Sequence, residues 1–344
     1  MLNANKCRFE PDITSRIAQK YSRVLLVIVV VGACSFALAD AAEFSIYDIQ
    51  YTEQTDGVSP LEGQVIDCLG GVVTHKFGGS RPKLTIQDPH SSAGWGAIQV
   101  KDWLSGAPLF NTASVGDWVR LSNVYVEEFR GNTTLQCFED NKPILTVVSS
   151  DNPLPEPILV RPEQIAAPVP DAYGDWYVED HSAEKYEHMR LRVRKVVVTD
   201  LGRGKAKDNY VLQDFTDADD TTLRCWASDY MNEDKVGDYH PYVQVEQRFC
   251  GVEGVLEQYT KTSAGWDYYQ LLTMSSNDLT LSQFADLDYD CDVDFDDFGY
   301  FAWLWLAEGT CSEPDWCGGA DVTEDGSVDV DDLVEFSGHW LQGR

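Results

Sequence analysis

The chain has 344 residues, a length that allows two or three domains. It carries 57 acidic and 26 basic side chains, which give a formal net charge of −31 at pH 7. So acidic a chain repels phosphate backbones, and salt-dependent, non-specific binding of nucleic acid is therefore disfavoured.

Residues 1–41 have the pattern of a secretory signal peptide. Arg16, Lys20 and Arg23 precede an apolar run over residues 24–39, and small residues follow it. This pattern predicts export with cleavage of the segment, and the run is too short to predict a membrane span. The alternative is a lipoprotein, because residues 31–34 resemble a lipobox and would make Cys34 a lipid anchor. The expected location is extracellular or at the cell surface, with no membrane span after cleavage.

Residues 45–281 predict β structure with an internal repeat. Short runs of alternating, β-branched and aromatic residues dominate this region. In order and spacing, residues 61–64, 72–74, 84–88, 97–100, 116–119 and 124–129 correspond to residues 186–189, 197–199, 210–214, 223–226, 243–245 and 254–259. The proline-rich residues 151–157 separate the two halves, since proline cannot join the interior of a sheet. We expect two tandem domains, at 45–155 and 158–281.

Each half supplies about five strands, with a non-strand stretch at residues 104–112 in the first and 228–236 in the second. This is the strand inventory of an OB-fold, a five-stranded Greek-key barrel. The first half from residue 59 and the second half with its lead-in from residue 155 resemble the OB-fold modules attached to secreted bacterial endonucleases. The resemblance implies two small tandem β-barrels. The competing fold, an immunoglobulin-like sandwich, needs more strands per repeat.

OB-folds bind ligands on the face of their second and third strands and in the adjacent loops, commonly by stacking on aromatic rings. The candidates for such contacts are Trp95, Trp103 and Tyr125 in the first half and Tyr210, Trp226 and Tyr230 in the second. Aromatic residues on strands are more often part of the core than of a binding face. The acidic charge favours a neutral polysaccharide or a protein as ligand over DNA.

No catalytic motif stands out in the chain. The six histidines lack the spacing of a zinc site, and no nucleophile elbow or phosphate loop occurs. Asp217, Asp219 and Asp220 form an acidic turn that reads as a solvated loop. A distant carboxylate pair, as in glycoside hydrolases, stays open as an alternative. We expect a protein that is not an enzyme.

Export permits disulfide bonds. Two of the nine cysteines, Cys7 and Cys34, lie in the predicted signal segment, and seven follow it. An odd number leaves at least one cysteine without a partner in the chain. Pairs Cys68–Cys137 and Cys225–Cys250 would each crosslink one half, with the second pair favoured. Cys311 and Cys317 are further candidates. The alternative is that some of these cysteines are buried small apolar residues.

The C-terminal segment, residues 284–342, carries two acidic loops, 286–297 and 321–332. Both place oxygen-bearing side chains at loop positions 1, 3, 5, 9 and 12, the arrangement of a calcium-binding EF-hand loop. The expected side-chain ligands are Asp286, Asp288, Asp290, Asp294 and Asp297 in the first loop and Asp321, Thr323, Asp325, Asp329 and Asp332 in the second. Asp292 and Ser327, at position 7, should offer backbone carbonyls. We therefore expect two Ca²⁺ ions.

An apolar pattern with helical spacing follows each loop, and no amphipathic pattern precedes the first. Such loop–helix duplication, with Asp at position 12, resembles a type I dockerin, and the linker from Cys311 to Cys317 resembles planctomycete dockerin-like tails. The resemblance implies calcium-dependent docking onto a cohesin or cohesin-like receptor. Two departures stand out. Position 6 of the first loop is Cys291 instead of glycine, and the partner-selecting positions 10 and 11 are Phe295 and Asp296, then Val330 and Asp331.

The whole sequence predicts a mostly β protein with a small α-helical C-terminal domain. We expect an exported, non-catalytic binding protein whose two OB-like modules are attached to a partner through a calcium-dependent dockerin. The alternatives are an accessory single-strand-binding component of an extracellular nuclease and a component of polysaccharide degradation.

Overall fold

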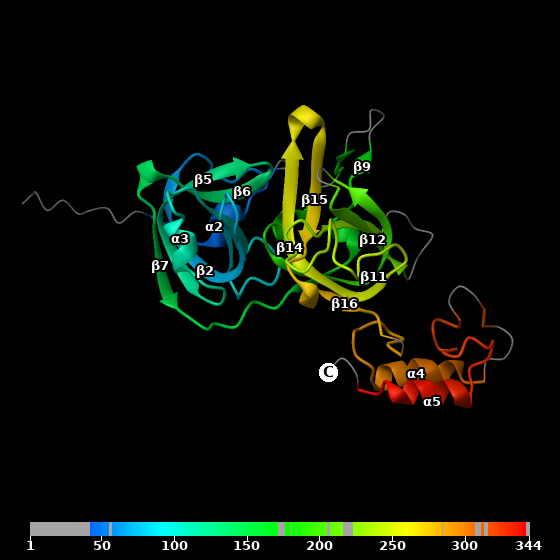
Figure 1. Cartoon of the computed structure of the whole chain (residues 1–344). Coiled ribbons are helices and arrows are strands. Elements are labelled where there is room, and N and C mark those ends of the chain that lie inside the picture. The colour runs from blue at the N-terminus through cyan, green and yellow to red at the C-terminus, as the bar shows by residue number, and fades with distance from the viewer. Residues whose placement is uncertain are drawn as a thin grey trace, which may run out of the picture. The chain divides into compact units, whose positions relative to one another are not determined.

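The computed structural model describes residues 42–54, 57–170, 176–179, 181–204, 207–215, 223–283, 285–306, 311–312 and 316–341. Most regular structure in these residues is β, in two sheets (Figure 1). The predicted signal segment with Cys34, the acidic turn at Asp217, Asp219 and Asp220, and Phe284 lie outside the described residues. In the part of the chain that the structure describes, no helix has the length and apolar character needed to cross a membrane.

The first sheet, which we call module 1, closes on itself through five strands. Its elements are β1 (Glu43–Phe44), α2 (Ile46–Gln50), β2 (Val65–Phe77), β3 (Lys83–Gln87), β4 (Ala97–Asp102), α3 (Pro108–Thr112), β5 (Trp118–Phe129), β6 (Asn132–Cys137), η1 (Glu139–Asn141) and β7 (Ile144–Ser149). Strand β2 pairs with β3, β3 with β4, β4 with β6, β6 with β5, and β5 again with β2. Gly70 permits this closure, because a Cβ atom there would lie 1.6 Å from the Val119 carbonyl oxygen of β5.

The second sheet, module 2, repeats the same circuit. Its elements are β8 (Ile158–Val160), η2 (Pro162–Gln164), β9 (Val169–Pro170), β10 (Trp176–Tyr177), η3 (Ser182–Tyr186), β11 (Arg190–Arg203), β12 (Asn209–Asp214), β13 (Arg224–Ser228), β14 (Arg248–Lys261), η5 (Thr262–Ala264), β15 (Trp266–Leu272), η6 (Ser276–Asp278) and β16 (Leu279–Leu281). Strands β11, β12, β13, β15 and β14 pair in that order, and β14 returns to β11. These five correspond in chain order to β2, β3, β4, β6 and β5, as the repeat predicts.

Each module is built around a hydrophobic core of its own. The core of module 1 includes Ile66, Ile86 and Leu121, and that of module 2 includes Leu212 and Phe249. The modules also contact each other directly. Lys83 forms an ion pair with Glu257 at 2.9 Å, and the Asn132 side chain exchanges hydrogen bonds with the Gln258 backbone. Backbone groups of one module also meet side chains of the other, as where the Thr133 N–H donates to Glu187.

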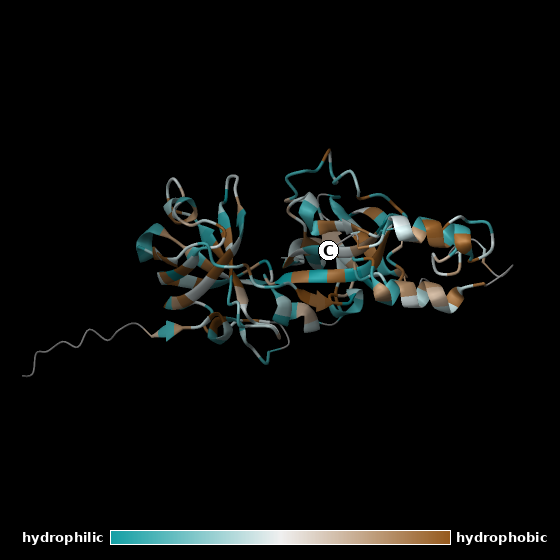
Figure 2. Cartoon of the chain, turned by 90° about the horizontal axis from the view of Figure 1, so that it is seen from below, coloured by the Kyte–Doolittle hydropathy of each residue, from teal (hydrophilic) through white to brown (hydrophobic). Residues whose placement is uncertain are grey.

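The remaining described residues, 285–341, are called the tail here. Its helices α4 (Phe295–Leu304) and α5 (Val330–Gly338) lie side by side, and each follows one acidic loop (Figure 1). Phe301 of α4 packs on Phe336 of α5 with ring centroids 5.3 Å apart, so the two helices share a hydrophobic core. Hydrophobic residues occur along both helices (Figure 2). Between β15 and the first loop, the described residues contain the short elements η6 and β16 and no α-helix.

The disulfides agree with the predictions only in part: the candidates Cys311 and Cys317 are confirmed, and the other two predicted pairs are not formed. Cys250 of β14 bonds to Cys291 of the first acidic loop, and Cys311 bonds to Cys317. Cys68, Cys137 and Cys225 are buried free thiols. The predicted pairs Cys68–Cys137 and Cys225–Cys250 are wrong, because their strands are not neighbours in the sheets. Strand β2 pairs with β3 and β5 and not β6, whereas β13 pairs with β12 and β15 and not β14.

Candidate functional site

The first acidic loop gathers carboxylates closely enough to hold a metal ion. Ligand atoms of Asp286, Asp288 and Asp290 lie within 4.8 Å of one another, and so do those of Asp292, Asp294 and Asp297. Asp286 and Asp297, at loop positions 1 and 12, are almost fully buried, as are Asp321 and Asp332 at the same positions of the second loop. Burial of these four carboxylates on a small exposed domain requires a compensating charge or hydrogen bonds.

Backbone N–H groups hold the first carboxylate of each loop in the same way. Asp286 accepts hydrogen bonds from the backbone of Asp290 at 2.9 Å and Cys291 at 3.1 Å. Asp321 accepts them from Asp325 at 3.1 Å and Gly326 at 2.8 Å. The chain is thereby wrapped around the position-1 carboxylate in both loops.

The last carboxylate of each loop caps the helix that follows. Asp297 accepts from the N–H of Asp294 at 2.7 Å, and Asp332 from that of Asp329 at 2.8 Å. In turn, the side chains of Asp294 and Asp329 are the N-caps of α4 and α5. In the second loop, the Thr323 hydroxyl also donates to Asp332, at 3.0 Å. Positions 3, 9 and 12, predicted as ligands, are therefore joined by local hydrogen bonds.

The electrostatics of the first loop suit a bound cation. Burial, together with the neighbouring charges of Asp297 and Asp290, raises the pKa of Asp286 to about 7. Burial and the same two neighbours raise the pKa of Asp288. A divalent cation removes this mutual repulsion, because it stabilises the ionised form of every carboxylate around it. The donor set consists of carboxylate, hydroxyl and carbonyl oxygens, which is the chemistry that Ca²⁺ and Mg²⁺ prefer.

The predicted partner-binding residues lie at the start of the two helices. Phe295 and Val330 are 74% and 59% exposed. The edge of the Phe295 ring nevertheless contacts Trp340, with ring centroids 5.0 Å apart. The backbone N–H groups of Asp296 and Asp331 donate to the N-cap carboxylates. Phe295 and Val330 thus occupy equivalent exposed positions.

A second candidate site is a cleft between the two modules, with a volume of about 410 Å³. Module 1 contributes the loop between β2 and β3, parts of β3 and β4, and the turn between β5 and β6. Module 2 contributes the start of β12, the residues after β13, and parts of β14 and β15. The side chains in this cleft that carry charge are Arg81, Lys83, Lys101, Arg130, Asp208 and Glu257, and the aromatic ones are Trp103, Phe129, Tyr230, Tyr259 and Tyr268.

Cations of the cleft pair with its aromatic rings. The guanidinium of Arg81 lies 5.3 Å from the ring centre of Trp103, and the ammonium of Lys101 lies 3.5 Å from that of Phe129. Arg130 of module 1 lies over Tyr259 of module 2 and donates a hydrogen bond to its hydroxyl at 2.9 Å. The cleft therefore presents positive charge and flat apolar surface together, on a chain whose net charge is strongly negative.

Two charged groups of the cleft, Lys101 and Glu257, have shifted pKa values. Burial and the charge of nearby Lys83 lower the pKa of Lys101 to about 7. Burial alone would raise the pKa of Glu257, but the adjacent ammonium group of Lys83 lowers it instead. The positive charge of Lys83 is thus balanced by the ionised carboxylate of Glu257. The Lys101 amine gains or loses its positive charge near neutral pH.

The six aromatic residues proposed as ligand contacts from the sequence lie in different parts of the structure. Trp103 and Tyr230 line the cleft. Tyr210 is fully buried in the core of module 2, and Trp226 packs between Trp176 and Tyr268. Trp95 meets Tyr51, and Tyr125 lies beside Phe138. Four of the six candidates therefore stabilise the modules or their loops, and the other two reach the cleft.

Sequence reasoning missed the basic residues of the cleft. Arg81 follows the glycine pair Gly78 and Gly79 in the loop between β2 and β3, and Arg130 precedes Gly131 in the turn between β5 and β6. A signal was present, because both arginines stand in the loops that flank the ligand face of an OB-fold. The average charge of the chain obscured it.

No protein-family model matches the chain, and no curated protein sequence matches it. Among solved structures, the chain is similar to a putative aspartyl-tRNA synthetase from Leishmania major Friedlin, with 10% identity, a TM-score of 0.25, and coverage of 35% of this chain and 23% of that one. It is also similar to fission yeast Pot1 with ssDNA, with 12% identity, a TM-score of 0.25, and coverage of 72% and 89%. A replication protein A heterotrimer bound to ssDNA matches with 11% identity, a TM-score of 0.23, and coverage of 73% and 71%. TM-scores this low carry no argument about the function of this chain.

Proposed function

We propose that this protein is an exported, non-catalytic binding protein in which two tandem OB-like barrels hold a single-stranded nucleic acid in the cleft between them. Its tail is a dockerin-like calcium module that attaches the barrels to a partner. The observation that carries the ligand assignment is the pairing of cations with aromatic rings in the cleft. Single strands are bound by the same combination of positive charge along the backbone and rings on which bases stack.

The strand order supports the OB-like assignment. Each module closes five strands in the circuit that a five-stranded Greek-key barrel requires. The cleft lies on the second and third strands of module 1, β3 and β4, and on the loops between its first and second and its fourth and fifth strands. This is the surface on which OB-folds bind extended chains.

The local charge favours an anionic ligand over the neutral polysaccharide expected from composition. The net charge of −31 describes the whole chain. The cleft contains four basic and two acidic side chains, and one of these acids, Glu257, is already paired with Lys83. Arg81 and Lys101 would form stronger, charge-assisted hydrogen bonds with phosphate groups than with the hydroxyl groups of a neutral polymer. The contacts between cations and phosphates make the binding salt-sensitive, and the surrounding acidic charge keeps its affinity modest.

Fluorescence anisotropy tests the ligand class. We expect a labelled oligothymidine to bind the full chain at low ionic strength, and the double variant Arg81→Ala, Arg130→Ala to bind about tenfold more weakly, as expected for lost stacking and phosphate contacts. The matched control is Arg120→Ala, because Arg120 lies on β5 in an exposed pair with Glu43. Binding of polygalacturonate without binding of oligothymidine would assign the cleft to an acidic polysaccharide and overturn the nucleic-acid proposal. Binding of a neutral β-glucan and of neither anionic polymer would show that the basic side chains of the cleft do not select the ligand.

For the tail, we propose two Ca²⁺ sites with the ligands predicted from sequence. The support is the repeated wrapping of backbone N–H groups around Asp286 and Asp321, and the burial of Asp286, which together with the charges of Asp297 and Asp290 raises its pKa. Bound calcium would neutralise these carboxylates and stabilise the tail. Calorimetry on the full chain should show uptake of calcium that Asp286→Asn and Asp321→Asn each reduce by one site. Absence of uptake would overturn the calcium assignment.

Attachment and location complete the proposal. A cohesin-like receptor would contact Phe295, Asp296, Val330 and Asp331, of which Phe295 and Val330 are exposed. Two disulfide bonds suit an oxidising compartment, which agrees with export and with either a secreted or a surface-anchored protein.

A further inference from the structure

The two acidic loops differ at position 6, where the chain must turn with a positive φ. In the second loop this position is Gly326, with φ +96°. In the first loop it is Cys291, with φ +82°. Glycine adopts such a conformation freely, whereas a residue with a Cβ atom is strained in it. The first loop therefore needs an additional constraint to hold the same shape.

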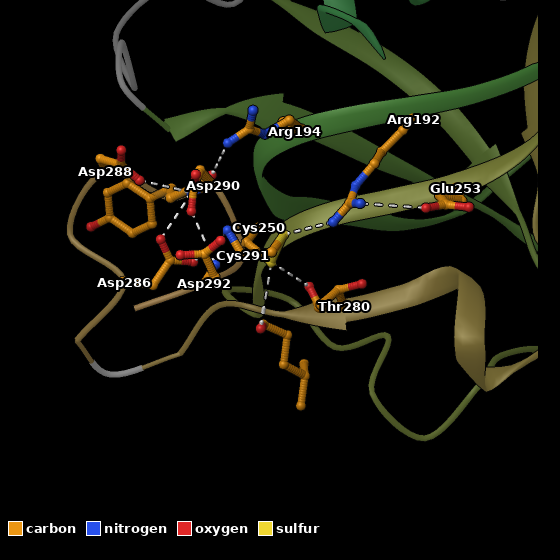
Figure 3. The surroundings of a disulfide bond; sticks show 12 residues. Arg192, Arg194, Cys250, Glu253, Thr280, Asp286, Asp288, Asp290, Cys291 and Asp292 are labelled. Atoms are coloured by element: carbon orange, nitrogen blue, oxygen red, sulfur yellow. Dashed lines mark hydrogen bonds and ion pairs between the residues drawn. A yellow bond between two sulfur atoms is a disulfide. The ribbon is translucent and has the colours of Figure 1, made fainter. Parts of the chain in front are cut away.

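Module 2 supplies that constraint through a covalent bond. Cys291 is bonded to Cys250 of β14, across 41 positions of the sequence (Figure 3). Arg192 of β11 donates a hydrogen bond to the Cys291 sulfur at 2.8 Å, and Arg192 is itself paired with Glu253 at 3.5 Å. The turn residue of the first loop is thus fixed to two adjacent strands of module 2.

Position 4 of the first loop is held by the same module. Tyr289 also has a positive φ, +57°, and its carbonyl oxygen accepts a hydrogen bond from Arg194 at 3.2 Å. The Tyr289 ring meets Phe215 edge to face, with centroids 4.3 Å apart. At the equivalent position of the second loop, Glu324 is exposed. Module 2 therefore contacts the first loop at both of its left-handed positions.

We infer that the Cys250–Cys291 disulfide is part of the first calcium site: it positions the loop for the ion, so that the bond strengthens calcium binding at the first loop and not at the second. The inference rests on the calcium sites proposed above. The same relationship works in reverse, because a ligand that prefers the bonded conformation must also stabilise the bond. Calcium should therefore shift the equilibrium of Cys250–Cys291 reduction towards the disulfide. In that reaction a dithiol gives two electrons and two protons to the disulfide, yielding two thiols, and itself becomes a disulfide.

Two variants that both lack the disulfide separate its conformational role from its crosslinking role. Cys250→Ala, Cys291→Ala keeps a Cβ atom at position 6, whereas Cys250→Ala, Cys291→Gly places glycine there. Calcium affinity at the first loop is measured by calorimetry on the full chain in an Asp321→Asn background. We expect the alanine variant to bind calcium about tenfold more weakly than the parent. The glycine variant should recover much of that loss, because glycine adopts the left-handed turn freely and alanine does not.

The second loop serves as the internal control. In an Asp286→Asn background, calcium uptake by the second loop should be unchanged by either cysteine variant, which also shows that the tail still folds. Loss of calcium binding at both loops would mean that the bond serves the folding of the whole tail. Unchanged calcium affinity at the first loop would mean that the bond does not position the loop for the ion. Either result would overturn the inference. Absence of calcium uptake by the parent protein in both backgrounds would instead overturn the calcium assignment itself.

The redox equilibrium gives an independent reading. The full chain is equilibrated with mixtures of reduced and oxidised dithiothreitol, in calcium or in chelator, and the alkylated thiols are located by peptide mass spectrometry. Calcium should shift the Cys250–Cys291 equilibrium towards the disulfide by at least severalfold, and the Cys311–Cys317 bond is followed for comparison. The same Cys250–Cys291 equilibrium with and without calcium, in a protein that binds calcium at the first loop, would contradict the coupling.

Discussion

Lys83 of β3 and Glu257 of β14 form an ion pair of 2.9 Å that connects the two modules at the edge of the cleft, and both side chains are only 17% exposed. Gln270 of β15 donates a further hydrogen bond to the second carboxylate oxygen, at 3.1 Å. A pair this sheltered from water helps to fix the geometry of the cleft, because the ion pair forms only when the two modules are in contact.

Removing one member of this pair should destabilise the protein. We expect Glu257→Leu to lower the free energy of unfolding by about 2 kcal/mol, because it leaves the Lys83 ammonium poorly solvated and without its partner. The double variant Lys83→Met, Glu257→Leu should recover most of that loss. Urea denaturation of the four proteins in a double-mutant cycle measures the coupling, and additive losses would show that the two side chains act independently.

Ligand binding should depend on pH through Lys101. The pKa of Lys101 is lowered to about 7, and the groups around it include Lys83, Glu257 and Glu127. The amine is charged below that pKa and neutral above it, so the affinity for an anionic chain should fall as pH rises from 6 to 8. A fall of about fivefold corresponds to one lost contact of about 1 kcal/mol.

The matched variants are Lys101→Arg, which keeps its charge at pH 8, and Lys101→Met, which lacks it at both pH values. Anisotropy titrations at pH 6 and 8 should show strong binding at both for the arginine variant and weak binding at both for the methionine variant. The same pH profile in all three proteins would assign the pH dependence to another group.

His75 should weaken the fold in acid. Burial and the charge of Arg190 lower the pKa of His75 to about 3, and its Nδ1 atom is buried without a hydrogen-bond partner in the described residues. The unfolded chain takes up a proton at this histidine near pH 6.5, whereas the folded chain does not. Stability is thus lost as pH falls from 6.5 towards 3, by about 2 kcal/mol between pH 7 and 5.

Replacing His75 with leucine should remove this part of the pH dependence. Chemical denaturation at pH 7 and 5, in calcium, should show a smaller decrease in the variant than in the parent. Buried His188, whose pKa is also lowered to about 3 by burial, is present in both proteins and cancels in the difference. An identical decrease in both would show that His75 is solvated in the folded state.

The exposed residues at the start of α4 and α5 should decide partner binding. Changing both Phe295 and Val330 to Ser should abolish capture by purified cohesin modules while leaving the calcium-bound fold intact. Val334→Ser is the control, because Val334 is 61% exposed in the middle of α5. Calorimetry and circular dichroism report the fold. Unfolding of the double variant would show that the Phe295–Trp340 contact serves the small tail core instead.

The sequence by itself predicted the features that depend on local spacing. The positions of Asp286, Asp288 and Asp290 imply a loop that wraps its own carboxylates, and the structure brings these residues together. Apolar residues at helical intervals predicted α4 and α5, and the ordered repeat of strand patterns predicted two modules with matching circuits. Such features follow from sequence because the periods of helix and strand and the geometry of a short loop involve neighbouring residues.

Only the tertiary structure decided which distant residues meet. Cys250 bonds to Cys291 and not to Cys225, because strand order places β13 away from β14. Tyr210 lies in a core while Arg130 faces a cleft formed with the other module. Strand patterns predict which residues share a face, but not which module or loop covers that face. Net charge likewise averages over the whole chain, whereas a binding site depends on the few charges that folding brings within several ångströms of one another.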